Sequence, residues 1–300
     1  MPRAHANGIE IEYEMFGKPN ATPLLLVMGL GAQMILWDEE FCEKLAARDF
    51  RVVRFDNRDV GLSTHVSKFG MPNVVSAMAA AMRGKPVEAA YTLHDMAADS
   101  VGLLDALGID SAHVVGASMG GMIVQTMALD FPSRVRTLTS IMSTTGNPDL
   151  PPARPEAGAV LLTPVPTDRE GYIERTITVA RTIGSSGFPF DEARVRQRAA
   201  RCYERGFHPE GIARQLVAIL ASGNRKPALP SVRIPTLVIH GGDDPLVPLA
   251  GGIDTAEAVP GAELLIIEGM GHDLPRDVWP RVIDAIRKLA DRAPGKRTLQ

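Results

Sequence analysis

The sequence contains little cysteine and few aromatic residues. Among its 300 residues only two are cysteines, Cys42 and Cys202, and 5% are aromatic. Two thiols in a chain of this length form at most one disulfide, and we expect both to stay reduced, as is usual in the cytoplasm. No cluster of cysteine and histidine has the spacing of metal ligands, so the sequence implies no metal site.

An excess of charge of one sign and long apolar runs are also absent. The formal net charge is -3 and no block of lysine and arginine occurs, so we expect no nucleic-acid partner. No apolar run reaches the roughly 18 residues that a membrane-spanning helix needs. The first residues, MPRAHANGIEIEYEMFG, lack the apolar core of a signal peptide and alternate as a strand does. These features favour a cytoplasmic protein without a membrane span.

Short apolar runs alternate with stretches of helical period along most of the chain. The runs begin at Pro23, Arg51, Ala112, Val135, Pro235 and Ala262. The helical stretches include residues 37–48, 92–107, 119–131 and 279–289. This alternation predicts a mostly parallel central sheet with helices on both faces. In such a sheet, ligands bind beyond the carboxyl ends of the strands.

The alternation is interrupted twice. After the linker-like segment TTGNPDLPPARPEAG, three helical stretches follow at about residues 169–183, 191–205 and 209–221. We therefore expect a helical cap at 144–229, inserted between a first core part at 1–143 and a second at 230–300. A shorter insertion at 65–91 contains VVSAMAAAMRG, which we interpret as a short helix.

The segment HVVGASMGGM places a serine between glycines where a buried strand turns into a helix. The pattern Gly116-x-Ser118-x-Gly120 is a nucleophile elbow, in which small neighbours allow a sharp turn that exposes the serine hydroxyl. An ordinary strand-to-helix turn with an N-capping serine is the alternative interpretation. The valine-rich strand before and the helix after the serine favour Ser118 as a nucleophile.

A serine hydroxyl needs a base, and a histidine base needs an acid that orients it. His272 lies in the loop EGMGHDLP directly after the last strand, at the same edge of the sheet as Ser118. The segment VIHGGDDPLVP after the preceding strand offers Asp243 and Asp244. Spacing alone does not separate these two aspartates.

Stabilisation of a developing oxyanion requires two backbone donors. One is expected to be the N–H of Met119, the residue after the nucleophile. The other is expected from the loop after an earlier strand, and VMGLGAQMILW supplies Gly29, Leu30 and Gly31 there. A simple strand-to-helix turn is the alternative interpretation of this loop.

With these motifs the chain resembles an α/β-hydrolase along nearly its whole length. The order Ser, Asp, His is that of the family. The segment FDNRDVGLS is similar to the family's Asp-x-Arg-Gly-x-Gly-x-Ser turn, with Asp59 where glycine is usual. The resemblance implies the α/β-hydrolase fold with a helical cap insertion.

The resemblance also selects among the candidate site residues. VMGLG stands where many members have His-Gly-x-x, so Met28 replaces the histidine and Leu30 becomes the first oxyanion donor. The family's acid usually lies four residues before the proline of Asp-x-x-x-Pro, which in DPLVP is Asp244, with Pro248 at the end.

Several motifs together are similar to the aclacinomycin methylesterase group, which cleaves methyl esters on polyketides. They are VMG, DNRDVGLS, GASMGGM and EGMGHDLP, the last with Glu268 in place of proline. The resemblance implies ester hydrolysis rather than a particular substrate. With the expected triad and apolar insertions, we expect a serine hydrolase that cleaves esters of small to medium apolar substrates through an acyl-enzyme, without a cofactor. Alternatives are a lactonase, a C–C bond hydrolase or a cofactor-free perhydrolase with the same triad, or a ligand-binding protein on this scaffold.

Methionines are frequent in and beside the expected catalytic loops and insertions. Because methionine adapts to irregular apolar shapes, we expect several of them to line a soft substrate pocket, with core packing as the alternative. The expected lining residues are Leu30, Met34, Met78, Met82, Met119, Met142 and Met270.

Overall fold

An eight-stranded sheet forms the centre of the computed structural model, which describes residues 2–293. Residues 294–300 of the expected second core part therefore lie outside the described residues. The strands are β1 (Arg3–Ala6), β2 (Ile9–Phe16), β3 (Thr22–Val27), β4 (Phe50–Phe55), β5 (Ala112–Ala117), β6 (Val135–Ile141), β7 (Thr236–Gly241) and β8 (Glu263–Ile267). Their order across the sheet is β1-β2-β4-β3-β5-β6-β7-β8.

Most neighbouring strands are parallel, as the sequence predicted. From β4 to β8 every neighbouring pair is parallel, whereas β1 and β2 form an antiparallel edge. The expected fold class, an α/β-hydrolase fold with a mostly parallel sheet between helices, is confirmed. The helices are α1 (Glu39–Ala46), α2 (Val74–Met82), α3 (Leu93–Ala106), α4 (Met119–Asp130), α5 (Pro155–Leu162), α6 (Arg169–Ile183), α7 (Glu192–Arg205), α8 (Pro209–Ser222), α9 (Leu249–Ala258) and α10 (Trp279–Ala290).

The sheet separates two hydrophobic clusters, and strand β3 contacts both of them. Side chains of a strand point alternately to its two faces. Leu25 and Val27 pack in the cluster with helices α3 and α4, while Leu24 and Leu26 pack in the cluster with α1 and α10. All four leucine and valine side chains are fully buried. Both faces of β3 are therefore covered, which explains its continuous apolar run.

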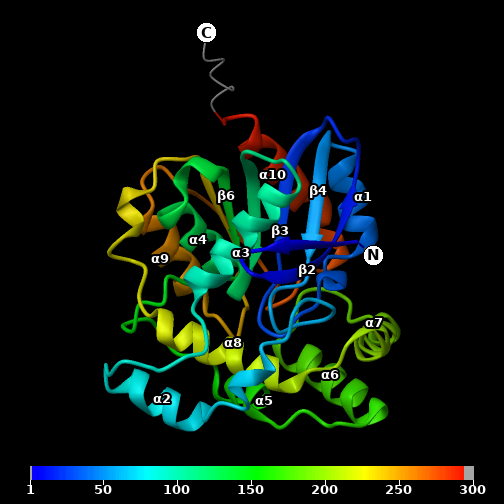
Figure 1. Cartoon of the computed structure of the whole chain (residues 1–300), viewed down its shortest axis with the longest axis vertical. Coiled ribbons are helices and arrows are strands. Elements are labelled where there is room, and N and C mark those ends of the chain that lie inside the picture. The colour runs from blue at the N-terminus through cyan, green and yellow to red at the C-terminus, as the bar shows by residue number, and fades with distance from the viewer. Residues whose placement is uncertain (1, 294–300) are drawn as a thin grey trace.

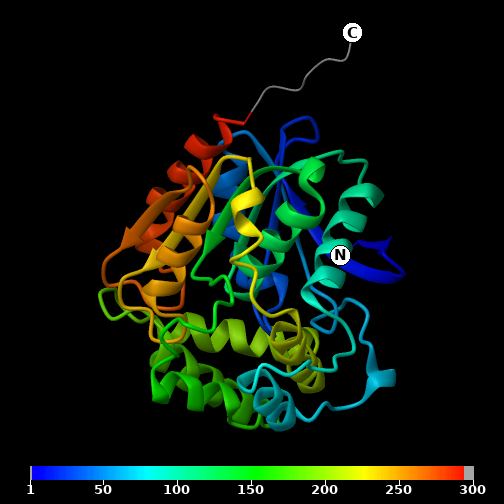
Figure 2. The ribbon, with the colours of Figure 1, turned by 90° about the vertical axis from the view of Figure 1, so that its left-hand side faces the viewer.

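The segments inserted after β4 and between β6 and β7 lie beyond the carboxyl ends of the strands (Figures 1 and 2). Helices α6, α7 and α8 begin and end within one residue of the expected helical stretches, and α2 forms in the 65–91 insertion. Helix α2 packs on α8, and α6 packs on α7. These helices cover the edge of the sheet where the candidate catalytic loops emerge. Within residues 2–293 no helix is long and apolar enough to cross a membrane.

The two cysteines are not bonded to each other. Cys42 packs in the cluster with α1 and α10, and Cys202 packs on α7 against Met34 and Ile35. Burial raises the pKa of each thiol to about 12, so both stay protonated and behave as small apolar side chains.

Candidate active site

Ser118 stands at the sharp turn between strand β5 and helix α4. Its backbone adopts φ 57° and ψ -121°, a conformation that is rare for any residue other than glycine. The neighbouring glycines make the turn possible. A Cβ atom at Gly116 would lie 2.1 Å from the Gly120 carbonyl oxygen, and one at Gly120 would lie 2.1 Å from the Val27 carbonyl oxygen. The turn therefore requires glycine at both positions, as expected of a nucleophile elbow.

His272 reaches Ser118 from the loop after strand β8. Its Nε2 lies 2.9 Å from the Ser118 Oγ, and its Nδ1 lies 2.7 Å from Asp244 Oδ2. An ionised carboxylate accepts hydrogen bonds and donates none, so Nδ1 carries the hydrogen and the free lone pair of Nε2 faces the serine hydroxyl. This is the tautomer that a histidine base needs to accept a proton from Ser118.

The Asp244 carboxylate is buried and held by backbone. Its Oδ1 accepts hydrogen bonds from the N–H groups of Leu246 and Val247, each at 2.9 Å. Only 4% of Asp244 is exposed. The carboxylate is thus fixed by the turn that follows β7, with its second oxygen directed at His272.

The two candidate aspartates have different partners. The Asp243 carboxylate accepts a hydrogen bond from the Ser186 hydroxyl in the connection between α6 and α7, whereas the His272 ring is hydrogen-bonded to Asp244. The structure therefore brings together Ser118, His272 and Asp244, and leaves Asp243 outside this chain of hydrogen bonds.

The candidate oxyanion loop lies against the nucleophile. A Cβ atom at Gly29 would lie 3.0 Å from the Ser118 Cβ, so the backbone approaches the serine closely. Within residues 2–293 neither the N–H of Leu30 nor that of Met119 donates a hydrogen bond to another residue. Two backbone donors near Ser118 are thus left available for a ligand oxygen.

The connection between α6 and α7 holds the loop that carries His272. The His272 N–H donates to the Ile183 carbonyl oxygen at 2.7 Å, and the Gly187 N–H donates to the Gly269 carbonyl oxygen at 2.9 Å. Ser185 accepts a hydrogen bond from the N–H of Gly271 at 2.9 Å. These contacts could not be predicted from the sequence, because serine and glycine are common in turns of every kind.

His240 is a buried residue near the site to which the sequence assigned no catalytic role. Its Nε2 lies 2.8 Å from the Val247 carbonyl oxygen and 3.7 Å from Asp244 Oδ2. Burial lowers its pKa, which keeps the imidazole neutral. His240 therefore supports the turn that presents Asp244.

The expected methionine lining is mostly wrong. Met34, Met119, Met142 and Met270 are buried within the hydrophobic clusters, and Met82 on α2 is 86% exposed. Core packing, the alternative interpretation, holds for the four buried methionines. Met119, Met142 and Met270 lie in the two clusters that cover the sheet, and Met34 packs with Ile35 and Cys202.

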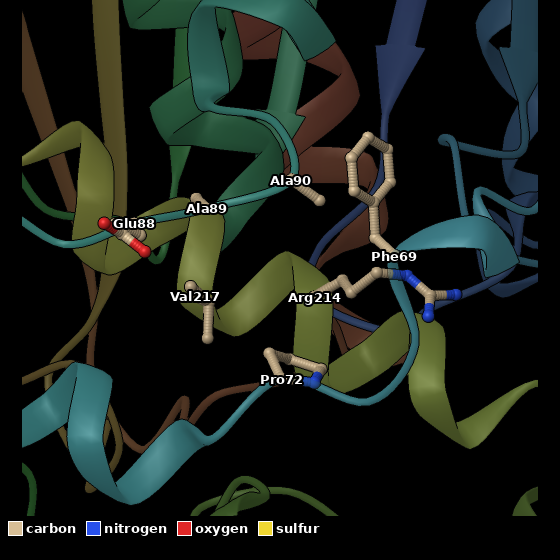
Figure 3. A pocket seen from close by; sticks show the side chains of 7 residues that line it. All are labelled: Phe69, Pro72, Glu88, Ala89, Ala90, Arg214 and Val217. Atoms are coloured by element: carbon tan, nitrogen blue, oxygen red, sulfur yellow. The ribbon is translucent and has the colours of Figure 1, made fainter.

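Two hollows are lined in part by Arg214 of helix α8, and neither is lined by Ser118, His272 or Asp244. Figure 3 shows the first, of about 260 Å³, beside helix α8. Its lining residues are Phe69, Pro72, Glu88, Ala89, Ala90, Arg214 and Val217. Within the described range, no three His, Cys, Asp or Glu side chains are grouped so as to hold a metal ion.

Comparison with known proteins agrees with the fold. The model of the alpha/beta hydrolase fold family matches residues 22–275. Rhodomycin D methylesterase of Streptomyces peucetius is 31% identical over 293 residues, covering 91% of this chain and 92% of the relative. The rhodomycin D methylesterase of Streptomyces sp. (strain C5) is 30% identical with the same coverage.

A solved structure agrees with the fold of the whole chain. The enol-lactonase from Burkholderia xenovorans LB400 has a TM-score of 0.71 at 22% identity, covering 97% of this chain and 98% of that one. The expected resemblance to a methylesterase group is confirmed by the sequence relatives, and the chain belongs to the α/β-hydrolase family.

Proposed function

We propose that the chain is a serine hydrolase that cleaves carboxylic esters, methyl esters of small to medium apolar molecules among them, through an acyl-enzyme. The observation that carries the proposal is the continuous chain of hydrogen bonds from the buried Asp244 through His272 to Ser118. The methylesterase relatives support the ester substrate. The reduced, buried thiols are consistent with action in the cytoplasm.

The first half of the reaction forms the acyl-enzyme. The Ser118 hydroxyl oxygen attacks the ester carbonyl carbon while its proton passes to His272 Nε2. Asp244 stabilises the imidazolium that results. The N–H groups of Leu30 and Met119 hold the carbonyl oxygen as it becomes negative. The intermediate then collapses, the C–O bond to the alcohol breaks, and His272 returns the proton to the alcohol.

The second half repeats these steps with water. His272 takes a proton from water, whose oxygen attacks the acyl carbon bound to Ser118. The carboxylic acid leaves, and the serine regains its proton from the imidazolium. The residues of the chain supply every proton transfer in this sequence, so the mechanism uses no cofactor.

We further propose that residues 144–229 act as a cap over the site, assisted by the segment 65–91. Helices α6 to α8 lie beyond the carboxyl ends of the strands (Figure 1), and the turn at Ile183 is hydrogen-bonded to His272. A substrate that reaches Ser118 has to pass between these helices and the sheet.

Replacing the nucleophile tests the proposal. Ser118→Ala removes the attacking hydroxyl and no core volume, so hydrolysis of methyl and p-nitrophenyl esters should fall by up to about a million-fold, as triad knockouts do. Circular dichroism should show an intact fold. A loss below about tenfold contradicts the proposal. If the wild-type enzyme opens lactones but does not hydrolyse methyl esters, the proposed triad stands and the proposed substrate class is wrong.

A further inference from the structure

The motif FDNRDVGLS, which the proposed reaction does not use directly, holds both ends of the oxyanion loop. The Asn57 side-chain amide donates to the Met28 carbonyl oxygen at 2.9 Å. The Asp56 carboxylate accepts the N–H of Met34 at 2.8 Å. Asp56 and Asn57 are both buried. The oxyanion loop after β3 is therefore fixed at Met28 and at Met34 by the turn after β4.

The middle of the loop is held from the cap, by Gln215 on helix α8. Its side-chain carbonyl Oε1 accepts the N–H of Gly31 at 2.8 Å. Its Nε2 donates to the Arg58 carbonyl oxygen at 2.8 Å. The side chain is fully buried. Both ends of the amide are thus satisfied, and one cap residue bridges the oxyanion loop and the turn after β4.

The hydrogen bond to Gly31 bears directly on the orientation of Leu30. Residues Gly29 to Ala32 form a turn in which the Ala32 N–H donates to the Gly29 carbonyl oxygen at 3.2 Å. Gly31, the third residue of the turn, has φ 65°, a left-handed conformation that favours glycine. The hydrogen bond from Gly31 to Gln215 holds the peptide group between Leu30 and Gly31 in place. The Gly31 N–H is therefore occupied and does not replace the Leu30 N–H as a donor to the oxyanion.

Helix α8 is itself anchored to the core close to Gln215. The Arg214 guanidinium makes two hydrogen bonds of 2.8 Å to the carboxylate of Asp59. Figure 3 shows Arg214 and Val217 projecting from α8, where they line one hollow together with Phe69. The position from which Gln215 reaches Gly31 is therefore set by a buried ion pair.

We propose that Gln215 is a positioning residue that sets the oxyanion donor of Leu30 from the cap. This inference rests on the proposed function, in which Leu30 and Met119 stabilise the oxyanion. Loss of one oxyanion donor costs about 100- to 1000-fold in kcat, and a displaced donor costs less. Removing the Gln215 amide should therefore lower kcat by about 10- to 100-fold and leave KM nearly unchanged.

The test compares two buried glutamines in the full-length enzyme. Gln215→Met removes the amide with little change in volume. Gln125→Met is the matched control, because Gln125 is also fully buried and also bridges two segments, through Ser140 at 3.3 Å and Arg225 at 3.1 Å. For each variant kcat, KM, the thermal unfolding midpoint and the Kd of a trifluoromethyl ketone are measured. The ketone forms a tetrahedral adduct that needs the oxyanion donors.

Gln215→Met should weaken ketone binding by the same factor as it lowers kcat. Gln125→Met should reduce the unfolding midpoint only. Equal kcat losses in the two variants, or a Gln215→Met variant with normal ketone affinity, overturn the inference. Burial beside the Arg58 carbonyl oxygen favours the protonated carboxyl in Gln215→Glu, which retains an acceptor for the Gly31 N–H and a donor for Arg58. It is therefore the variant to measure if Gln215→Met does not fold. It should bind the ketone within about tenfold of wild type, and a folded Gln215→Glu enzyme outside that range contradicts the inference.

Ser118→Ala separates this inference from the proposed function. Activity that survives Ser118→Ala overturns the function itself, whatever Gln215 does. An inactive Ser118→Ala enzyme together with an unaltered Gln215→Met enzyme overturns only the role of Gln215.

Discussion

At the scale of residues, two adjacent aspartates with the same chemistry have different surroundings. Asp244 is buried, accepts two backbone N–H groups and contacts His272, whereas Asp243 contacts the hydroxyl of Ser186. Orientation of the imidazole requires a fixed negative charge at Nδ1. Only Asp244 provides that charge.

Asparagine substitution of each aspartate should therefore have unequal effects. Asp244→Asn offers an amide that can hold the wrong tautomer of His272, so kcat should fall by about ten-thousand-fold, as in a related triad. Asp243→Asn should cost less than about tenfold, because it alters one contact with Ser186. Steady-state kinetics on a p-nitrophenyl ester measure both. Small and equal losses would show that the acid lies elsewhere.

Local patterns in the sequence were enough to select Ser118 and His272, two candidate residues that the structure brings together. Ser118 follows from its flanking glycines, and His272 follows from its place after the last strand. Asp244 was preferred to Asp243 as the candidate acid only through the resemblance to the family, because spacing does not reveal which carboxylate turns inward. The contacts of Gln215 and Ser185 could not be predicted from the sequence, because they join segments that are far apart in the chain.

At the scale of elements, a buried ion pair connects the cap to the turn after β4. Asp59, which stands where the family usually has glycine, has φ 68° and so retains the left-handed backbone that glycine favours. Aspartate tolerates this conformation better than most residues do. Its carboxylate pairs with Arg214 and also accepts a hydrogen bond from the Tyr91 hydroxyl at 2.8 Å. The departure from glycine thus gives α8 an anchor.

Breaking this pair should destabilise the protein strongly. Arg214→Met leaves the Asp59 carboxylate buried without its cation, which costs about 3–5 kcal/mol of unfolding free energy. Asp59→Gly combined with Arg214→Met removes both charges, so the double variant should recover much of that loss. Urea unfolding measures the three proteins. An Arg214→Met variant within about 1 kcal/mol of wild type would contradict a stabilising pair.

Elements with a regular pattern were predicted from sequence, and two helices were missed. Helix α5 (Pro155–Leu162) begins in a segment rich in proline and glycine that resembles a linker, although proline is well tolerated in the first turn of a helix. Helix α9 (Leu249–Ala258) contains adjacent glycines, which weaken the helical signal. A Cβ atom at Gly252 would lie 2.5 Å from His240 Nδ1, so packing requires glycine there.

At the scale of the whole molecule, the cap helices lie over the carboxyl edge of the sheet and are fastened to it at several points (Figure 2). These connections include the hydrogen bonds between Ile183 and His272 and between Gln215 and Gly31. A third is the ion pair between Arg214 and Asp59. A cap held in this way should remain closed over the site rather than open as a lipase lid does at an oil surface.

A fixed cap limits the length of the acyl chain that the enzyme accepts. We expect p-nitrophenyl esters of about two to eight acyl carbons to be hydrolysed best. Each methylene that is buried should lower the activation free energy that kcat/KM reports by up to about 0.8 kcal/mol. This gain should stop once the pocket is full. The measurement is kcat/KM against acyl length. A continuous rise to palmitate, or activation by an oil-water interface, would contradict a fixed cap.

Trapping the nucleophile tests the central claim, that Ser118 forms a covalent acyl-enzyme, most directly. The enzyme is treated with diethyl p-nitrophenyl phosphate, which transfers a diethylphosphoryl group to an activated serine, and is then analysed by intact and peptide mass spectrometry. We predict a single adduct on the peptide that contains Ser118, loss of esterase activity in step with its formation, and no adduct in Ser118→Ala. An adduct on another residue, or an unmodified enzyme that the reagent nevertheless inactivates, would contradict the account.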